Sequence, residues 1–395
     1  MQLASYRSEM SDELKQLLQY WTEHTPDIQN GGFVGKIDEH NRIHPDAPKG
    51  SVLNSRILWT FASAYNSTSN TEYLKMADRA YEFLSNYFID PEWGGVYWTV
   101  DYSGRPLDTK KQVYASAFAL YAMAEYYNCR KDESVKARAL ALIDTIEKYS
   151  FDPVHTGYID AFARDWTEMQ DIRLSAKDAN EKKTMNTHLH VLEAYTQLYR
   201  IAPSELLNKR LRQLILNFSE HFIDERSGHL QLFFDENWKA KPGPVSYGHD
   251  IEASWLLLEA AEVLGDKLLV EVIKEIALNI AEAAIEGLDK DGGLWYERSE
   301  HSNELIKEKH WWPQAEAMVG FFNAYQISGD KSYLKLSINS WEFIKKNIKD
   351  PVYGEWYWGI EEDYSPMKNQ DKAGLWKCPY HNGRACLEVM RRIGE

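Results

Sequence analysis

The chain of 395 residues is poor in cysteine and has no long apolar run. Its three cysteines, Cys129, Cys378 and Cys386, form neither a disulfide framework nor a CxxC metal-binding pattern, which favours a reducing compartment. No stretch approaches the roughly 18 apolar residues of a membrane-spanning helix, and the segment MQLASYRSEM lacks the apolar core of a signal peptide. We therefore expect a soluble, cytoplasmic protein that makes no contact with membranes.

Basic clusters and nucleotide-binding loops are also missing. The 45 Lys and Arg residues are outnumbered by 60 Asp and Glu, which gives a formal net charge of −15, and they form no block. Phosphate contacts need clustered cations, so nucleic acid is not an expected partner. Neither GxGxxG nor GxxxxGK[ST] occurs, and no HxxxH pair provides a zinc signature. We expect no cofactor and no metal, although distant parts of the chain could still assemble a metal site.

Aromatic residues, in contrast, are abundant. The chain has 14 Trp, 24 Tyr and 14 Phe, together 13% of its residues. Most such rings pack in a core, but flat rings also line the clefts in which proteins hold sugars. The composition therefore allows a large core, an aromatic cleft, or both.

Short segments of glycine followed by aromatic residues recur six times along the chain. They lie at successive spacings of 63, 63, 71, 64 and 62 residues, at Gly31, Gly94, Gly157, Gly228, Gly292 and Gly354. In most of them an aspartate precedes a glycine by four residues. A glycine after a polar turn, followed by alternating aromatics, indicates a tight turn that opens a short strand.

Two helical patterns lie between successive segments. Residues 71–88 have apolar residues on one side only, whereas residues 251–265 are apolar around most of the helix. Outer and inner helices should therefore alternate six times. An open solenoid would need polar end repeats, and none is evident. We predict an all-α fold, a single-domain (α/α)6 barrel over residues 1–395, with short β-hairpin segments at one end.

The residues that open each inner helix should meet at one mouth of this barrel. Capping alone would favour Ser, Thr, Asp or Asn at such positions. His188 and His190 diverge by about 200° around a helix, so only one can face the cavity. His190 shares a face with Asn186, and we expect His188 to be structural. The predicted mouth contains Asn54, Arg56, Tyr114, Asn186, His190, His249, Glu252, Trp312, Glu316, Trp376 and His381.

Five of these helix starts carry a specific resemblance. KGSVLNSRILWTF, MNTHLHVLEAY, SYGHDIEASWLL, KHWWPQAEAM and LWKCPYHNGR resemble the cellobiose 2-epimerases, a family within the N-acylglucosamine 2-epimerase superfamily. The resemblance runs from Gly31 to Arg384. It implies an (α/α)6 barrel that requires no metal or cofactor. It also implies an isomerase that inverts C2 of the reducing-end sugar, converting cellobiose to glucosyl-mannose and lactose to epilactose.

The same resemblance implies roles for individual residues. His249 of YGHDIE and His381 of PYHNGR match the acid/base catalysts of the family, and His190 of NTHLH would assist near O1 and O2. Arg56 of LNSR would polarise the carbonyl. Glu252 resembles a partner that orients a histidine. The remaining residues implied on the substrate side are Tyr114, Asp178, Asn186, Trp312, Glu316 and Trp376, of which Asp178 and Glu316 lie in looser motifs.

These residue types suit proton transfer at a sugar carbon. The C2 proton becomes removable only when C1 is a carbonyl, so the sugar ring must open before an enediolate can form. Arg56 offers a fixed cation with several donors to that enediolate. Histidine exchanges protons near neutral pH. We expect His249 and His381 to share deprotonation and reprotonation, with the order of the two left open.

Three other functions remain as alternatives. An N-acylglucosamine 2-epimerase or a mannose-type isomerase would use the same histidines, but the adjacent Trp311 and Trp312 suit a second sugar ring and favour a disaccharide. A glycoside hydrolase would need Glu252 and Glu316 to face each other across the scissile bond. A sugar-binding protein without turnover would leave the histidines unexplained. The charged outer helix faces predict a monomer or weak dimer.

Overall fold

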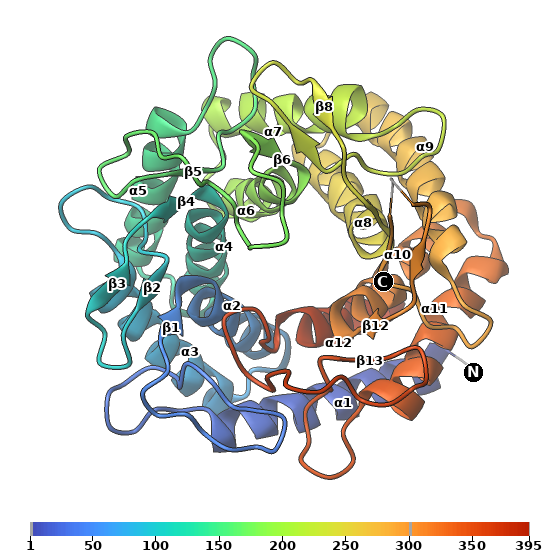
Figure 1. Ribbon diagram of the computed structural model, residues 1–395, viewed down its shortest axis with the longest axis horizontal. Helices are drawn as coiled ribbons and strands as arrows, with labels where there is room; N and C mark the ends of the chain where they lie inside the picture. The colour runs from blue at the N-terminus through green and yellow to red at the C-terminus, as the bar shows by residue number, and fades with distance from the viewer. Residues whose placement is uncertain (1–2, 300–301, 395) are drawn as a thin grey trace.

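Two concentric rings of helices form the architecture of the computed structural model, which describes residues 3–299 and 302–394 (Figure 1). Each inner helix packs against the next, and the last one returns to the first, so the inner ring is closed. The inner helices are α2 (Ser51–Thr68), α4 (Val113–Arg130), α6 (Met185–Ile201), α8 (Tyr247–Leu264), α10 (Trp311–Ser328) and α12 (Tyr380–Gly394). The outer helices are α1 (Leu3–His24), α3 (Thr71–Phe83), α5 (Glu133–Tyr149), α7 (Glu205–Asn217), α9 (Lys267–Ala284) and α11 (Lys331–Phe343). The predicted (α/α)6 barrel is confirmed.

The first helix of the chain closes the outer ring. α1 packs on α12, the last inner helix, and also bonds to residues at the end of the sixth unit. The indole of Trp341 on α11 donates to Glu9 at 2.7 Å, and the indole of Trp356 donates to Glu13 at 2.7 Å. The ring therefore needs no polar end caps, because its first and last helices cover each other.

The two rings differ in burial as the sequence patterns predict. Almost every residue of α8 is buried from its start to Ala261, whereas α3 buries mainly Ala77, Ala80 and Phe83. The predicted helix at 71–88 consists of α3 and a π-helical turn at Leu84–Phe88. Similar turns follow α7 (Phe218–Phe222) and α11 (Ile344–Ile348), and a 3₁₀ turn follows α9 (Ile285–Gly287). No helix within residues 3–299 and 302–394 is both long enough and apolar enough to cross a membrane.

Short antiparallel strands gather on the face where the inner helices begin (Figure 1). The strand before an inner helix pairs with the strand after the next outer helix, as when Lys49 pairs with Val100 and Gly50 with Thr99. The equivalent pairing of the last unit is the bridge between Ile37 and Ala373. The sheets are β1 (Lys49–Gly50) with β2 (Thr99–Val100) and β3 (Pro106–Asp108); β4 (Lys111–Gln112) with β5 (Ala161–Phe162); β6 (Lys183–Thr184) with β7 (Phe233–Phe234) and β8 (Ala240–Lys241); β9 (Val245–Ser246) with β10 (Glu297–Arg298) and β11 (Leu305–Ile306); and β12 (Lys309–His310) with β13 (Gly359–Ile360).

The recurring aspartates anchor the turns to these strands. In the first unit, the side chain of Asp27 accepts backbone N–H groups within its own turn and also pairs with the buried ammonium of Lys49 at 2.8 Å. Buried pairing keeps both charges compensated. In the fourth unit Val245 takes the position of the lysine, so α8 begins without this ion pair. The other four pairs are Lys111–Asp90, Lys183–Asp152, Lys309–Asp289 and Lys372–Asp350.

His188 is structural, as the helix geometry predicts. Its Nδ1 lies 2.7 Å from the carbonyl oxygen of Thr184, and its Nε2 accepts the backbone N–H of Tyr158 at 2.9 Å. Gly157, with φ +77°, lets the turn approach this ring, since a Cβ there would lie 2.7 Å from Nε2. Burial lowers the pKa of His188 to about 3, so the ring stays neutral while the protein is folded.

Replacing His188 with glutamine should make the protein less sensitive to acid. Gln314 of the fifth unit already makes the equivalent contacts, because its Nε2 donates to the His310 carbonyl and its Oε1 accepts the Leu294 N–H. The unfolded state protonates His188 below its ordinary pKa near 6.5, whereas the folded state does not until about pH 3. The free energy of unfolding of the natural protein should therefore fall by about 2.5 kcal/mol more than that of the variant between pH 7.5 and pH 4.5. Urea unfolding at the two pH values measures this difference, and equal losses would contradict it.

Candidate active site

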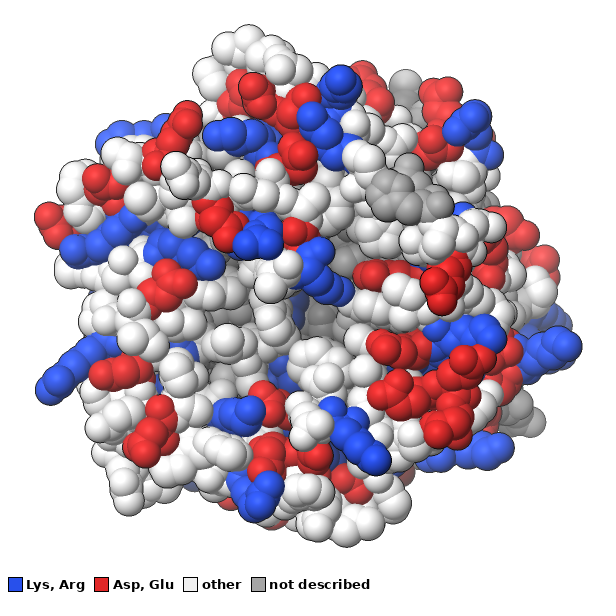
Figure 2. All heavy atoms as spheres, in the orientation of Figure 1, with Lys and Arg blue, Asp and Glu red and all other residues white. Residues whose placement is uncertain are grey.

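The predicted site residues meet where the inner helices begin, on the face that carries the strands. Figure 2 shows this face hollowed at its centre, with basic and acidic side chains intermingled around the opening. The sugar-site candidates come from every inner helix, together with Asp178 and Trp376 in the loops before α6 and α12. The barrel thus converts residues that lie far apart in the sequence into neighbours.

Ring and hydrogen-bond contacts connect these candidates around the cavity. The Arg56 guanidinium donates to the Tyr114 hydroxyl at 2.7 Å. The ring of Tyr114 lies 5.0 Å from that of His190 and 6.1 Å from that of Trp376. The ring of Trp312 lies near two other histidines, 4.8 Å from the ring of His249 and 5.7 Å from that of His381. The structure therefore brings the predicted aromatic and basic residues into one site.

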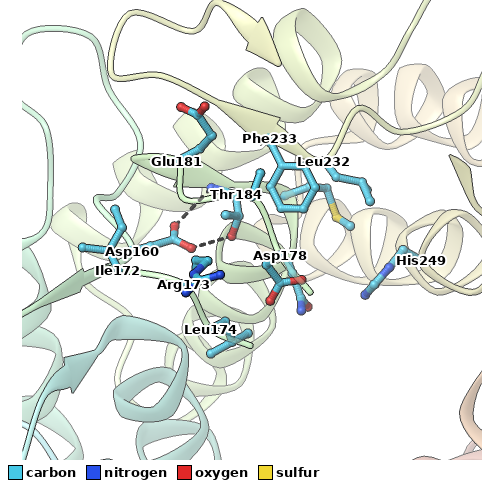
Figure 3. Close-up of a pocket in the computed structure, with 13 residues that line it drawn as sticks. Asp160, Ile172, Arg173, Leu174, Asp178, Glu181, Thr184, Leu232, Phe233 and His249 are labelled. Carbon is cyan, nitrogen blue, oxygen red and sulfur yellow. Dashed lines mark hydrogen bonds between the residues drawn. The ribbon is translucent and has the colours of Figure 1, made fainter. Parts of the chain in front are cut away.

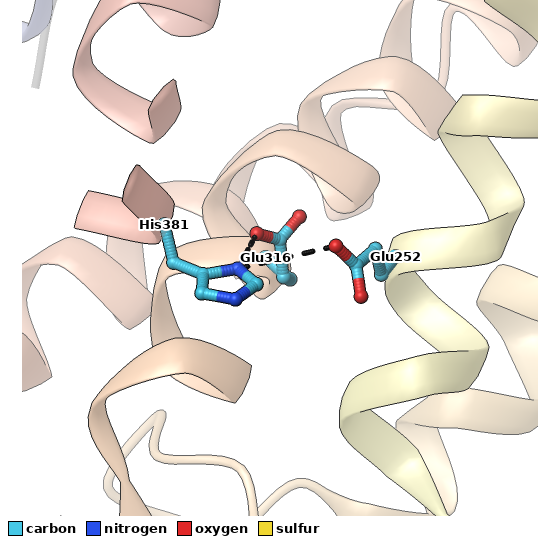
Figure 4. Close-up of side chains that lie close together, drawn as sticks. All are labelled: Glu252, Glu316 and His381. Atoms are coloured by element: carbon cyan, nitrogen blue, oxygen red, sulfur yellow. Dashed lines mark hydrogen bonds and ion pairs between the residues drawn. The ribbon is translucent and has the colours of Figure 1, made fainter. Parts of the chain in front are cut away.

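Two of the histidines are backed by glutamates. Nδ1 of His190 lies 2.9 Å from Glu193 Oε2, and Nδ1 of His381 lies 2.7 Å from Glu316 Oε1 (Figure 4). A carboxylate oxygen at Nδ1 favours the tautomer that carries its proton there, which leaves Nε2 as the free acceptor. Both rings are therefore arranged as bases with a fixed orientation.

The third histidine has a different partner. Nδ1 of His249 lies 2.8 Å from the hydroxyl of Ser246, which can donate or accept. Burial, followed by nearby positive groups such as Lys177, lowers the pKa of His249 well below 6.5. Burial likewise lowers the pKa values of His190 and His381, so all three rings are neutral at pH 7.

Arg56 is a buried cation that forms no ion pair with a carboxylate within residues 3–299 and 302–394. Its guanidinium lies 4.2 Å from the centroid of the Phe118 ring and 4.9 Å from that of Tyr380, and its Nε has no hydrogen-bond partner in this part of the chain. The side chain is only 3% exposed. A buried cation held by aromatic faces and one hydroxyl retains donor capacity for an oxyanion in the cavity.

A side cavity beside the start of α6 contains Asp178, a candidate from a loose motif, together with two candidates from specific motifs. Asp178, Asn186 and His249 line it together, and Figure 3 shows the imidazole of His249 directed toward Asp178. One oxygen of Asp178 accepts both the N–H and the hydroxyl of Ser175 at 2.8 Å, which fixes the carboxylate. The buried Oδ1 of Asn186 has no hydrogen-bond partner among the residues that the structure describes. Both residues are thus placed to contact a ligand beside His249.

Both glutamates lie near His381. The resemblance implies that Glu252 orients a histidine; the hydrogen bond at His381 Nδ1 is made by Glu316 at 2.7 Å, and Glu252 Oε1 lies 3.9 Å from the same atom. Glu252 instead accepts from Arg384 at 2.5 Å. The cause is the position of α10 between α8 and α12, which places Glu316 closer to His381 than Glu252 of α8.

The same glutamates do not have the geometry of a glycosidase pair. Glu252 and Glu316 both accept from Nη2 of Arg384, so they lie side by side rather than across a cavity. With His381 they also form a cluster whose ligand atoms lie within 4.8 Å of one another. The Arg384 guanidinium already supplies the positive charge between these two carboxylates.

Sequence reasoning missed three residues of the site. Glu193, Tyr380 and Arg384 are buried, and each bonds to the others or to the histidine pairs. Two of them had a local signal, because Glu193 follows His190 by three residues and Arg384 follows His381 by three, on the same helix faces. Tyr380 had none beyond its place in the PYHNGR motif.

Known proteins resemble this chain over nearly its whole length. The model of the N-acylglucosamine 2-epimerase (GlcNAc 2-epimerase) family matches residues 31–385. The chain belongs to this epimerase family. A cellobiose 2-epimerase of Bacteroides fragilis is 49% identical to it, over 97% of this chain and 98% of the relative. A cellobiose 2-epimerase of Dictyoglomus turgidum is 40% identical over 100% of both chains.

Solved structures agree with this membership. The cellobiose 2-epimerase of Bacillus thermoamylovorans superposes with a TM-score of 0.94 at 40% identity, over 98% of this family member and 100% of that chain. A D-mannose isomerase superposes with a TM-score of 0.84 at 21% identity, which establishes a shared fold. The protein is similar to cellobiose 2-epimerases along its length, and it is a carbohydrate epimerase, an isomerase, as its motifs predicted.

Proposed function

We propose that this epimerase inverts C2 of the reducing-end glucose of β-1,4-linked disaccharides. The observation that carries the proposal is that the rings of His249 and His381, from different helices, both lie beside the ring of Trp312. A sugar stacked on that ring would place C2 within reach of both imidazoles. Similarity to cellobiose 2-epimerases over nearly the full chain supports cellobiose as a substrate, and lactose shares its reducing-end glucose. The whole chain would act as one catalytic domain.

The reaction begins with ring opening and ends with an inverted carbon. A histidine base takes the anomeric hydroxyl proton while an acid protonates the ring oxygen, which exposes the C1 aldehyde. The neutral Nε2 atoms of His190 and His381 suit the base role, since their Nδ1 atoms face glutamates. A base then removes the C2 proton to give a cis-enediolate. Arg56 stabilises the developing negative charge at O1 and O2.

Inversion requires the proton to return to the opposite face of C2. His249 on α8 and His381 on α12 approach from different helices, separated by α10, so one can take the proton and the other can supply one. Rotation about C2–C3 in the enediolate gives the same outcome. We assign Glu316 to positioning His381 rather than to direct sugar contact, because its two oxygens accept from Arg384 and Trp255 and lie against His381.

The second sugar ring would lie toward the mouth. Trp376 is half-buried in the loop before α12, and its ring lies 5.7 Å from that of Trp98, so two indoles flank the entrance beside Tyr114. Flat apolar rings of this kind stack on sugar faces. This platform favours a disaccharide over the monosaccharide substrates of an N-acylglucosamine 2-epimerase or a mannose-type isomerase, which would use the same histidines.

Incubation with cellobiose in D2O tests the proposal. EDTA-treated protein should produce a mannose-type reducing end that carries deuterium at C2. NMR of the anomeric protons detects this product. A ketose product would instead indicate an isomerase, and free glucose would indicate a hydrolase. If cellobiose stays unchanged while N-acetylglucosamine or mannose exchanges its C2 proton, the disaccharide assignment is overturned and the enediolate chemistry is kept.

A further inference from the structure

Arg384 occupies the centre of a buried charge cluster behind the histidines. Its side chain is 1% exposed and lies on the face of α12 that carries His381. Nη2 donates to Glu252 Oε1 at 2.5 Å and to Glu316 Oε1 at 2.7 Å. Nη1 donates to Glu193 and to the Tyr380 hydroxyl. One planar guanidinium thus contacts acidic residues of three different inner helices, α6, α8 and α10.

These contacts connect two separate histidine–glutamate pairs. Glu193 Oε2 accepts a hydrogen bond from Nδ1 of His190, and Glu193 Oε1 accepts one from Arg384. Glu316 Oε1 accepts hydrogen bonds from Nδ1 of His381 and from Arg384. The two imidazoles therefore belong to one continuous hydrogen-bond network. Among the described contacts, the Arg384 guanidinium is the only link between Glu193 and Glu316.

We propose, on the basis of the function proposed above, that Arg384 is a positioning residue that couples His190 and His381. By holding Glu193 and Glu316 in fixed places, the guanidinium keeps the proton of each imidazole on Nδ1 and both Nε2 atoms free toward the sugar. Arginine suits this position because its two terminal nitrogens fork toward different carboxylates, whereas the lysine ammonium is a single point charge on a flexible stem.

The charges of the cluster fit this role. Burial would raise the pKa of Glu193, but the Arg384 charge and the bond from His190 lower it to about 2, so this carboxylate is ionised. Burial, with the neighbouring Glu316 charge, raises the pKa of Glu252, and the Arg384 charge and hydrogen bond oppose this rise. Burial also raises the pKa of Glu316, and the Arg384 charge and hydrogen bond oppose this rise. Without its charge, both histidine partners would be buried acids with no cation beside them.

An Arg384→Lys variant tests the coupling, and Arg392→Lys is its matched control. Arg392 lies on the same helix, also packs against Trp255, and bonds to Asn323 and Gln326 outside the site. We expect Arg384→Lys to lower kcat on cellobiose by about 10- to 100-fold with KM within about threefold, the range found when the hydrogen-bond partners of metal-ligating histidines are lost. Arg392→Lys should keep both constants near those of the natural protein. A folded Arg384→Lys variant with unchanged kcat would overturn the proposal.

Histidine NMR provides a readout that does not depend on activity. Protein labelled with 15N-histidine should show His190 and His381 as Nδ1–H tautomers, assigned through the loss of signals in single His→Asn variants. Arg384→Lys should give a mixture of the two tautomers for both rings, and Arg392→Lys should leave the tautomers unchanged. Unchanged tautomers in Arg384→Lys would refute the coupling, whichever sugar the natural protein acts on.

If Arg384→Lys does not fold, Glu193→Gln provides the test. This variant should also shift the NMR signals of His381, although Glu193 makes no hydrogen bond to His381 among the described contacts. No shift at His381 would overturn the proposal.

Discussion

Replacing His381 with asparagine is expected to lower kcat for cellobiose epimerisation by roughly 10²- to 10⁴-fold, the usual contribution of a general acid or base. Asparagine can still hydrogen bond to Glu316, which lies 2.7 Å from Nδ1 of the natural ring, so the α10–α12 contact survives. It cannot accept a proton from C2. Initial rates from NMR of the anomeric protons measure the loss, and His188→Gln, which changes a buried histidine outside the site, should retain full activity.

Deuterium exchange distinguishes the roles of the two histidines. The variant that lacks the base for the forward step should show no exchange at C2 of cellobiose in D2O. The variant that lacks the opposite partner should return the proton to the same face, and so exchange C2 without forming a mannose-type product. Comparison of His381→Asn with His249→Asn therefore assigns the order of proton transfer. Near-normal epimerisation in either folded variant would contradict the assignment of this pair.

Replacing Arg56 with lysine is expected to lower kcat by about 10²- to 10³-fold, in the range found when a donor to an oxyanion is removed. The guanidinium is held between aromatic rings and donates to Tyr114 at 2.7 Å, so its remaining N–H groups have a fixed direction. A lysine ammonium keeps the charge but not the planar set of donors. The loss should fall on kcat more than on KM, because charge on O1 and O2 develops only as the enediolate forms.

Two further measurements test this reading of Arg56. Guanidinium chloride at millimolar concentration should partly restore the activity of Arg56→Ala, since the small cation fits the space left by the side chain. Arg212→Lys is the control for the substitution itself, because Arg212 lies on α7 in the outer ring and pairs there with Asp266. This control should leave kcat and KM unchanged. A folded Arg56→Lys variant with natural kcat would show that the enediolate is stabilised elsewhere.

The fold could be predicted because its repeat is local and regular. The spacing of Gly31, Gly94 and the later turns sets the length of each unit, and helical periodicity separates buried helices from half-buried ones. Closure into a ring followed from the lack of polar end repeats. The pairing of α1 with α12 could not be read in the same way, because nothing in the spacing of the units indicates that the chain begins with an outer helix.

The site was predictable where a helix start carried its own signal and not where contacts cross between helices. His190, His249 and His381 stand at equivalent places in different units, so the repeat itself groups them. The partners of these rings depend on side-chain directions across α6, α8, α10 and α12. Glu316 therefore replaced Glu252 as the partner of His381, and Arg384 became visible only with the structure.

The pairing of α1 with α12 has a consequence for the order in which the protein can mature. Trp356 bonds to Glu13 across 343 positions, so the contact that seals the barrel closes a loop of nearly the whole chain. Such distant contacts form late in folding, because the chain entropy of the loop must be lost before they stabilise it. His381 sits on α12, the helix that α1 covers. Catalytic activity should therefore appear only when the two ends of the ring have met, so activity reports closure of the barrel.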